Sequence, residues 1–93
     1  MVIVSFLNDQ TLHIKKDTIL NGYKVTFDDS KKEYCLEKVY SNSINGGASK
    51  LSTENPMIGI AGFIGSVDYF SVGNDPDNAI LFKSTSIKSI QNR

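Results

Sequence analysis

The chain of 93 residues contains one cysteine, one histidine, two prolines and no tryptophan. A single cysteine cannot form an internal disulfide or a zinc cluster, so we do not expect a disulfide-stapled secreted scaffold. A catalytic imidazole needs a nucleophile or an orienting carboxylate beside it, and no motif supplies either to His13. His13 is interpreted as a surface residue and Cys35 as a small packing residue. The sequence therefore predicts no enzyme, with no catalytic residue, metal ligand or cofactor.

Long apolar runs are also missing, because no stretch approaches the roughly 18 consecutive apolar residues of a membrane-spanning helix. The first residues have no basic start followed by an apolar run, as a signal peptide would. From these features we expect a cytoplasmic protein without a membrane partner. Ten Lys and Arg residues balance ten Asp and Glu residues, which argues against a nucleic-acid partner. Abundant Lys, Ile, Asn and Ser suggest a bacterial or bacteriophage genome of low GC content.

What the sequence does contain is a series of short β patterns separated by polar turns. Val2–Leu7 is β-branched and aromatic, and it is followed by turn-forming residues 8–10 and the alternating segment Thr11–Ile14. This pattern predicts a hairpin. Asn21-Gly22 is typical of a type I′ turn.

The segment after that turn alternates at the period of a half-buried strand, with Tyr23, Val25 and Phe27 on one side. We expect this apolar side to face the core. A strand over Glu33–Tyr40 is predicted to follow the polar turn 28–32. It would carry Tyr34, Leu36 and Tyr40 on one face and Cys35 and Val39 on the other.

The second half of the chain begins with a polar segment, 41–56, which is longer than most connections inside a compact domain. Residues 56–65 are apolar with glycines at 59, 62 and 65, a pattern that suits either a short buried helix or a strand. The glycines indicate close backbone packing or an apolar contact surface rather than a phosphate cradle, because the lysine of a P-loop is missing. Strands are predicted over 67–72, 79–83 and 86–90. The turn 74–78 between the first two has acidic residues but no calcium-loop pattern.

These patterns together predict a mainly β fold. We expect a small barrel or a strongly twisted antiparallel sheet built from hairpins, with at most one short helix around 56–65. The whole chain, 1–93, is interpreted as a single small β-rich domain with a long polar loop, 41–56.

Two short segments carry a resemblance to a known family. Phe6-Leu7-Asn8-Asp9 resembles the first-motif turn of Sm-like RNA-binding barrels, and residues 82–90 resemble the closing strand pair of those barrels. The resemblance is confined to these two short stretches of hairpin sequence. It implies a small barrel fold.

The candidate binding residues are aromatic, because a core of this size does not easily bury every Tyr and Phe in the chain. On a sheet face, such side chains form rigid anchors of protein interfaces or stack on bases. The residues singled out are Tyr23, Tyr34, Tyr40, Phe63 and Tyr69.

The function predicted from the sequence is a non-enzymatic binding module. A protein–protein interaction partner, inhibitor or accessory factor is the first hypothesis, with formation of a homo-oligomer through an exposed apolar strand or the glycine-containing segment. The second hypothesis is a small-ligand or nucleotide-binding protein with a pocket at a subunit interface. The third is a small barrel that binds single-stranded nucleic acid.

Overall fold

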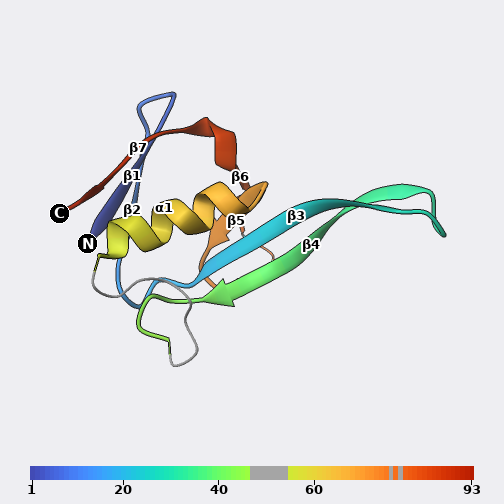
Figure 1. Ribbon diagram of the computed structural model, residues 1–93, viewed down its shortest axis with the longest axis horizontal. Helices are drawn as coiled ribbons and strands as arrows, with labels where there is room; N and C mark the ends of the chain where they lie inside the picture. Colours follow the sequence, from blue (N-terminus) through green and yellow to red (C-terminus); the bar gives the residue numbers. More distant parts are fainter. Residues whose placement is uncertain (47–54, 76, 78) are drawn as a thin grey trace.

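The computed structural model describes residues 1–46, 55–75, 77 and 79–93. Its regular elements, in chain order, are β1 (Val2–Phe6), β2 (Thr11–Ile14), β3 (Leu20–Asp28), β4 (Glu33–Asn42), α1 (Pro56–Ser66), β5 (Tyr69–Val72), β6 (Phe82–Lys83), a short 3-10 helix η1 (Ser84–Ser86) and β7 (Ile87–Asn92). Figure 1 shows how they are arranged in space. The mainly β fold with one short helix is confirmed.

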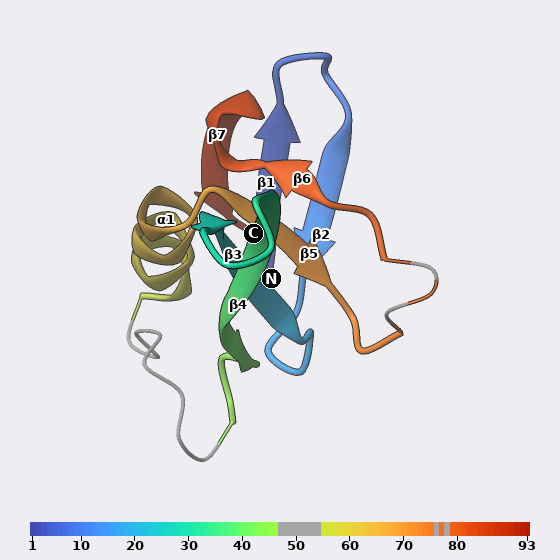
Figure 2. The same ribbon diagram turned by 90° about the vertical axis from the view of Figure 1, so that its right-hand side faces the viewer.

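The described strands form two antiparallel sheets and not a closed barrel. One sheet has the order β2-β1-β7 and the other the order β4-β3-β5-β6. In Figure 2, strands β2, β1 and β7 stand side by side, with β5 and β6 crossing them. Strands that are adjacent in the sequence form the hairpins β1–β2, β3–β4 and β5–β6. The last strand, β7, pairs with the first, β1. The twisted-sheet form of the fold prediction therefore holds, and the barrel form does not.

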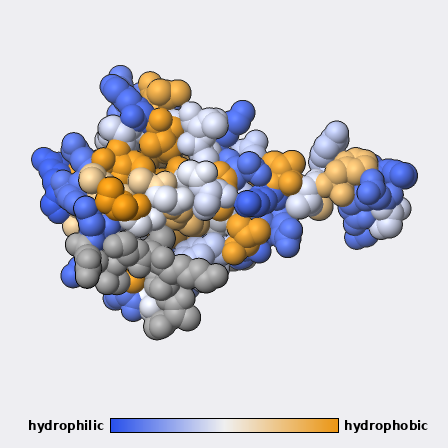
Figure 3. Space-filling model, viewed as in Figure 1, coloured by the Kyte–Doolittle hydropathy of each residue, from blue (hydrophilic) through white to orange (hydrophobic). Residues whose placement is uncertain are grey.

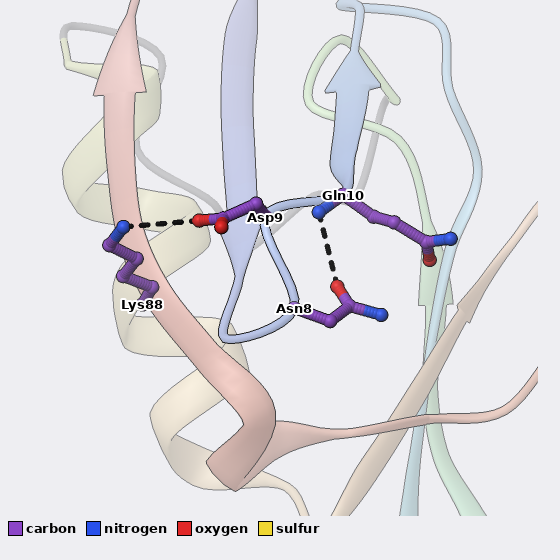
Figure 4. A network of polar contacts seen from close by, with 4 residues as sticks. All are labelled: Asn8, Asp9, Gln10 and Lys88. Atoms are coloured by element: carbon purple, nitrogen blue, oxygen red, sulfur yellow. Dashed lines mark hydrogen bonds and ion pairs between the residues drawn. The ribbon is translucent and has the colours of Figure 1, made fainter.

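The first hairpin was predicted correctly, and its turn is stabilised by local polar contacts (Figure 4). The backbone N–H of Gln10 donates to Asn8 Oδ1 at 3.1 Å. Asp9 adopts a left-handed backbone conformation with φ 67°, which aspartate tolerates better than most residues. Its carboxylate lies 3.2 Å from Lys88 Nζ on β7, so an exposed ion pair links the turn to the neighbouring strand.

The two sheets and the helix share one apolar core. Its buried members are Val2, Val4, Phe6, Ile14, Leu20, Ile44, Ile60, Phe63, Ile64, Val67 and Phe70. Phe6 of one sheet stacks on Phe82 of the other with ring centroids 5.0 Å apart. Helix α1 buries Ile60, Phe63 and Ile64 in this core, and it begins at Pro56, where a missing N–H costs no helical hydrogen bond.

Asn21-Gly22 is not a turn, contrary to the sequence prediction, because β3 runs straight through both residues. Glycine is needed at position 22 because of tertiary packing and not because of a local turn. A Cβ built on Gly22 would lie 2.8 Å from Phe63 Cε1 and 2.8 Å from Val67 Cγ1. Only a residue without a side chain lets α1 and the segment after it pack this closely on the strand.

The glycines of α1 behave in the opposite way. A Cβ built on Gly62 or Gly65 would meet no atom within 4 Å. The prediction that these glycines allow close backbone packing is therefore wrong for Gly62 and Gly65.

The second half of the chain otherwise follows the predicted order with shorter strands. The strand expected over 79–83 covers only Phe82–Lys83, although it does pair with β5 as a hairpin. The predicted last strand is β7. The Sm-like resemblance implied a closing strand pair, but β6 pairs with β5 whereas β7 pairs with β1. Half of the polar loop 41–56, residues 47–54, lies outside the described residues, and β4 continues into its start as far as Asn42.

The hairpin of β3 and β4 is the longest element pair and projects from the body (Figure 1). Strand β5 pairs with β3 only from Leu20 to Tyr23, so among the described strands none lies beside the rest of the hairpin. We call its outer part, residues 24–37, the arm. The molecule consequently measures 45 Å along its longest axis and 23 Å along its shortest.

Candidate binding surface

The sheet β4-β3-β5-β6 has one face against the core and one open face. Directly paired residues of neighbouring strands point to the same side, and the side changes at each step along a strand. One row across the sheet reads Tyr40–Gly22–Phe70–Phe82 and faces the core and α1. The adjacent row reads Lys38–Tyr23–Tyr69–Lys83 and faces away from them. We call this second side the open face.

The row Lys38–Tyr23–Tyr69–Lys83 places two aromatic rings between two lysines. Lys38 Nζ lies 6.0 Å from the centre of the Tyr23 ring, within range of a cation–π contact. Both tyrosines are half-buried. The row is thus a partly covered aromatic surface with positive charge at its two ends.

Next to it, towards the start of β3, lies a polar row, Ser41–Asn21–Ser71. Asn21 is buried, and its Nδ2 donates to Ser71 Oγ at 3.2 Å and to the Gly73 carbonyl at 2.8 Å. Asn21 Oδ1 accepts from Ser41 Oγ at 2.7 Å. These bonds satisfy the buried amide, since an unpaired amide here would cost about 1–3 kcal/mol. The polar row therefore ties β4, β3 and β5 together beside a pocket of ≈ 200 Å³.

On the other side of the tyrosine row, the open face becomes apolar and continues along the arm. Val25 pairs with Leu36, and Phe27 pairs with Tyr34. The exposed fractions of these four residues are 51% for Val25, 37% for Leu36, 45% for Phe27 and 80% for Tyr34. The rings of Phe27 and Tyr34 meet edge to face with centroids 5.0 Å apart. We call these four residues the arm stripe.

A shallow hollow of ≈ 370 Å³ lies where the arm stripe meets the body. It is lined by Val25, Tyr34, Cys35, Leu36, Tyr69 and Leu81. Leu81 and the neighbouring Ile80 are themselves 47% and 66% exposed, and they extend the apolar surface beyond the arm. In the space-filling view, the arm stands clear of the body and presents hydrophobic next to hydrophilic atoms (Figure 3).

Asp68 marks the point at which the arm separates from the sheet. Its backbone N–H donates to the Tyr23 carbonyl at 2.9 Å, and its carboxylate accepts the Val25 N–H at 2.9 Å. The Asp68 carboxylate thereby accepts the Val25 hydrogen bond that a backbone carbonyl would accept if β5 paired further along β3. A charged residue at this edge also discourages accidental strand pairing.

Three of the five candidate residues predicted from the sequence come together on the open face. Tyr23 and Tyr69 are directly paired, and Tyr34 lies further out on the arm. Tyr40 and Phe63 do not join them, because their rings pack on each other at 5.2 Å on the core side of the sheet.

The misplacement of Tyr40 has a local cause. Gly22 pairs with Tyr40 while Tyr23 pairs with Lys38, so Val39 is an extra residue that bulges from β4. A bulge reverses the alternation of the side chains beyond it. Tyr40 therefore points to the side opposite Tyr34 and Leu36, not to the same side as predicted.

The sequence reasoning missed Val25, Phe27 and Leu36 as surface residues. The alternation of Tyr23, Val25 and Phe27 was interpreted as a core-facing pattern, and this was wrong. Leu20 and Gly22 face the core on β3, so residues 23, 25 and 27 must point away from it. The length of the hairpin could have indicated that these residues are exposed, because a strand pair this long extends beyond the core of a small domain.

The single histidine and single cysteine have separate outcomes. His13 is exposed, as predicted. Cys35 is exposed and not a packing residue, since it lies on the side of the arm away from the stripe. Its Sγ lies 2.8 Å from Thr26 Oγ1 on the paired strand.

The electrostatics of the arm are set by its turn. Hydrogen bonds from the Ser30 hydroxyl and then from the Lys31 and Ser30 backbone N–H groups hold the pKa of Asp28 below its usual value.

Within the part of the chain that the structure describes, no three His, Cys, Asp or Glu residues gather where they could hold a metal ion. Among the same residues, no helix is long and apolar enough to cross a bilayer.

No protein-family model, curated protein sequence or solved structure matches this chain.

Proposed function

We propose that this chain is a non-enzymatic protein-binding module of bacterial or phage origin, and that it binds protein through the open face of its arm. The observation that carries the proposal is the arm stripe, in which four large apolar side chains remain exposed together on a projecting hairpin. Their exposed area is roughly 400 Å², a patch size that in monomeric proteins often marks an interaction site.

The shape of the arm supports binding to a protein surface. Its two strands are fully paired with each other from Val25–Leu36 to Asp28–Glu33, so the stripe is held in place before any partner arrives. A rigid surface loses little conformational entropy on binding. Phe27 and Tyr34 at its end are aromatic anchors of the type that dominates interface energetics.

A single-stranded nucleic-acid ligand is the second candidate, and the row Lys38–Tyr23–Tyr69–Lys83 is the observation that favours it. Aromatic rings flanked by lysines stack on bases in sheet-based binders. Charge argues against this candidate, because the arm and the adjacent Lys38 together contain four lysines and four acidic residues. A neutral surface gains no counterion-release energy from a phosphate backbone.

A small-ligand function has less support. The pocket beside the polar row is ≈ 200 Å³, below the roughly 300–1,000 Å³ of most ligand pockets, and the larger hollow of ≈ 370 Å³ is shallow and open to solvent. Its buried amide, Asn21, already uses its donors and its acceptor within the protein.

Site-specific photo-crosslinking tests the protein-binding proposal. A benzoylphenylalanine residue replaces Phe27 on the arm stripe, and a control carries it in place of Ile58. Ile58 is a fair control because it is also large and exposed, at 57%, but belongs to α1 on the other side of the sheet. Each labelled chain is irradiated in an extract of its native host, supplemented with unlabelled chain. We expect protein adducts at position 27 that position 58 does not form, and equal labelling at the two positions would refute the proposal.

Two further measurements address the alternatives. In a thermal-shift assay against a nucleotide panel, we expect Tm to change by less than about 1 °C, because no nucleotide should bind. A nucleotide that did bind would, at 100 times its Kd, stabilise the fold by about 2.7 kcal/mol and raise Tm clearly. Retention of a single-stranded oligonucleotide that weakens as salt rises would favour the nucleic-acid candidate instead.

A further inference from the structure

We propose that the arm stripe is covered by a second copy of this chain, with the two arms antiparallel and related by a two-fold axis. This inference rests on the proposed function and names its partner. It begins from the order of rows on the open face: the tyrosine row, then Val25–Leu36, then Phe27–Tyr34 at the end of the arm.

That order is self-complementary. Successive rows on one face lie two residues apart along the strand, about 6.6–6.8 Å. If the two-fold axis passes through the Val25–Leu36 row, the end row of each copy lies over the base of the other. The partner subunit's Phe27 then lies over Tyr23, beside Tyr69 and the hollow of ≈ 370 Å³ that Tyr69 and Leu81 line.

The available area reaches the lower limit for a stable dimer. The exposed fractions of the arm stripe, Ile80 and Leu81 correspond to roughly 600 Å² of side-chain area per copy, or about 1,200 Å² for two copies when all of it is covered. Specific interfaces bury about 1,200–2,000 Å² in total. Two sheets packed face to face, as in a sandwich, bring such side chains into contact at a separation of about 10 Å.

Charge also fits a second copy. Identical surfaces meet in a two-fold interface, so an arm with net charge would repel its own copy. The arm alone contains three lysines and four acidic residues, and Lys38 of the tyrosine row balances this single negative charge, so residues 24–38 are neutral. Lys24, Glu37 and Cys35 lie on the opposite side of the arm, which leaves the stripe itself without ionised groups between its two rows.

Light scattering coupled to size exclusion measures the stoichiometry directly. Over about a hundredfold range of concentration, we expect the mass to rise from 10.3 kDa towards twice that value. Replacing the most exposed stripe residue, Tyr34→Lys, should raise the dissociation constant by about 10-fold or more, whereas Ile58→Lys should leave it within about twofold. Because both side chains are largely exposed, thermal unfolding of each variant verifies that the fold is intact. A wild-type mass of 10.3 kDa throughout, or a dimer that Tyr34→Lys does not weaken, overturns the inference.

A thiol crosslink tests the geometry. In a Cys35→Ser background, Val25→Cys places one thiol per copy beside the proposed axis, and a short bis-maleimide crosslinker should link two chains, because backbones about 10 Å apart are too far for a direct disulfide. Ile58→Cys in the same background should not link. A dimer that forms without a Val25→Cys crosslink would contradict the face-to-face arrangement and point to pairing through the β4 edge.

The photo-adduct at position 27 separates the failure of this inference from the failure of the proposed function. An adduct with the chain itself supports both. An adduct with a different protein only overturns the second-copy partner and leaves the protein-binding module in place. Absence of any adduct overturns both.

Discussion

Replacing Gly22 with alanine should destabilise the protein, even though the same change is stabilising elsewhere in the chain. The new Cβ would lie 2.8 Å from Phe63 Cε1, 3.2 Å from Phe63 Cζ and 2.8 Å from Val67 Cγ1. Carbon atoms in contact normally lie about 3.5–4.0 Å apart, so both buried neighbours must shift by roughly 0.7 Å or more. Overpacking of this kind costs about 1–3 kcal/mol.

A smaller effect opposes this cost. Alanine restricts the unfolded chain more than glycine does, which stabilises the fold by about 0.4–1 kcal/mol where the backbone conformation is compatible. Gly22 lies in regular β3 and its φ is not in the left-handed region, so the offset applies. We therefore expect a net loss of about 1–2 kcal/mol in the free energy of unfolding. For a domain of this size, that corresponds to a fall of roughly 4–16 °C in Tm.

The matched control is Gly62→Ala in α1, where the new Cβ would meet nothing within 4 Å. Alanine is favoured over glycine in a helix interior by about 0.5–1 kcal/mol, so this variant should be more stable than the parent. Urea denaturation followed by circular dichroism measures both variants on the same scale. Opposite signs are expected for one and the same chemical change.

A third variant connects the loss to its cause. In a Val67→Ala background Cγ1 is gone, so Gly22→Ala should cost about 0.5–1 kcal/mol less than it does in the parent. If Gly22→Ala is neutral or stabilising, or if its cost is the same in both backgrounds, then the close approach of α1 to β3 is not what requires glycine at this position.

The remaining predictions concern the polar contacts of the open sheet. Asn21→Ala should lower the free energy of unfolding by about 2–3 kcal/mol in urea titrations, because it removes three hydrogen bonds at a buried site, and a loss below about 0.5 kcal/mol would contradict this. Asp68→Ala should speed hydrogen exchange of the Val25 amide while leaving amides in the core of β1 unchanged, since only the former loses its acceptor. NMR titration should find the Asp28 carboxyl with a pKa below 3.8. The pKa of Asp28 is lower in the folded than in the unfolded protein, so its contribution to arm stability is present at pH values above the unfolded pKa and is lost as pH falls through the folded pKa. A measured pKa above 3.8 would refute the turn geometry.

Most of the local structure of this protein could be read from its sequence. Period-two alternation and polar turns located the hairpin of β1 and β2 and the strands β3 and β4, because these signals act over a few residues. The apolar stretch 56–65 was predicted to be either a short helix or a strand, and it forms the helix α1. Exposed Tyr34 and the paired Tyr23 and Tyr69 were within the predicted binding set.

What the sequence could not determine was which side of each strand faces the core. Alternation defines two sides of β3 and does not label them, and the side that carries Tyr23, Val25 and Phe27 was assigned to the interior incorrectly. The choice depends on α1, which packs on Gly22 from a position about forty residues further along the chain. One bulged residue, Val39, then sends Tyr40 to the helix and leaves Tyr34 on the open face.

The exposed arm stripe is thus a joint product of local and tertiary structure. The sequence by itself determined that two strands with apolar residues on alternate positions flank the polar turn 28–32, since strand period and turn chemistry are local. Only the tertiary structure decided that the core would end near Tyr23 and that α1 would occupy the Gly22 side of the sheet. Long-range packing of the helix leaves the arm stripe exposed, because a single small core can cover just one face of so long a hairpin.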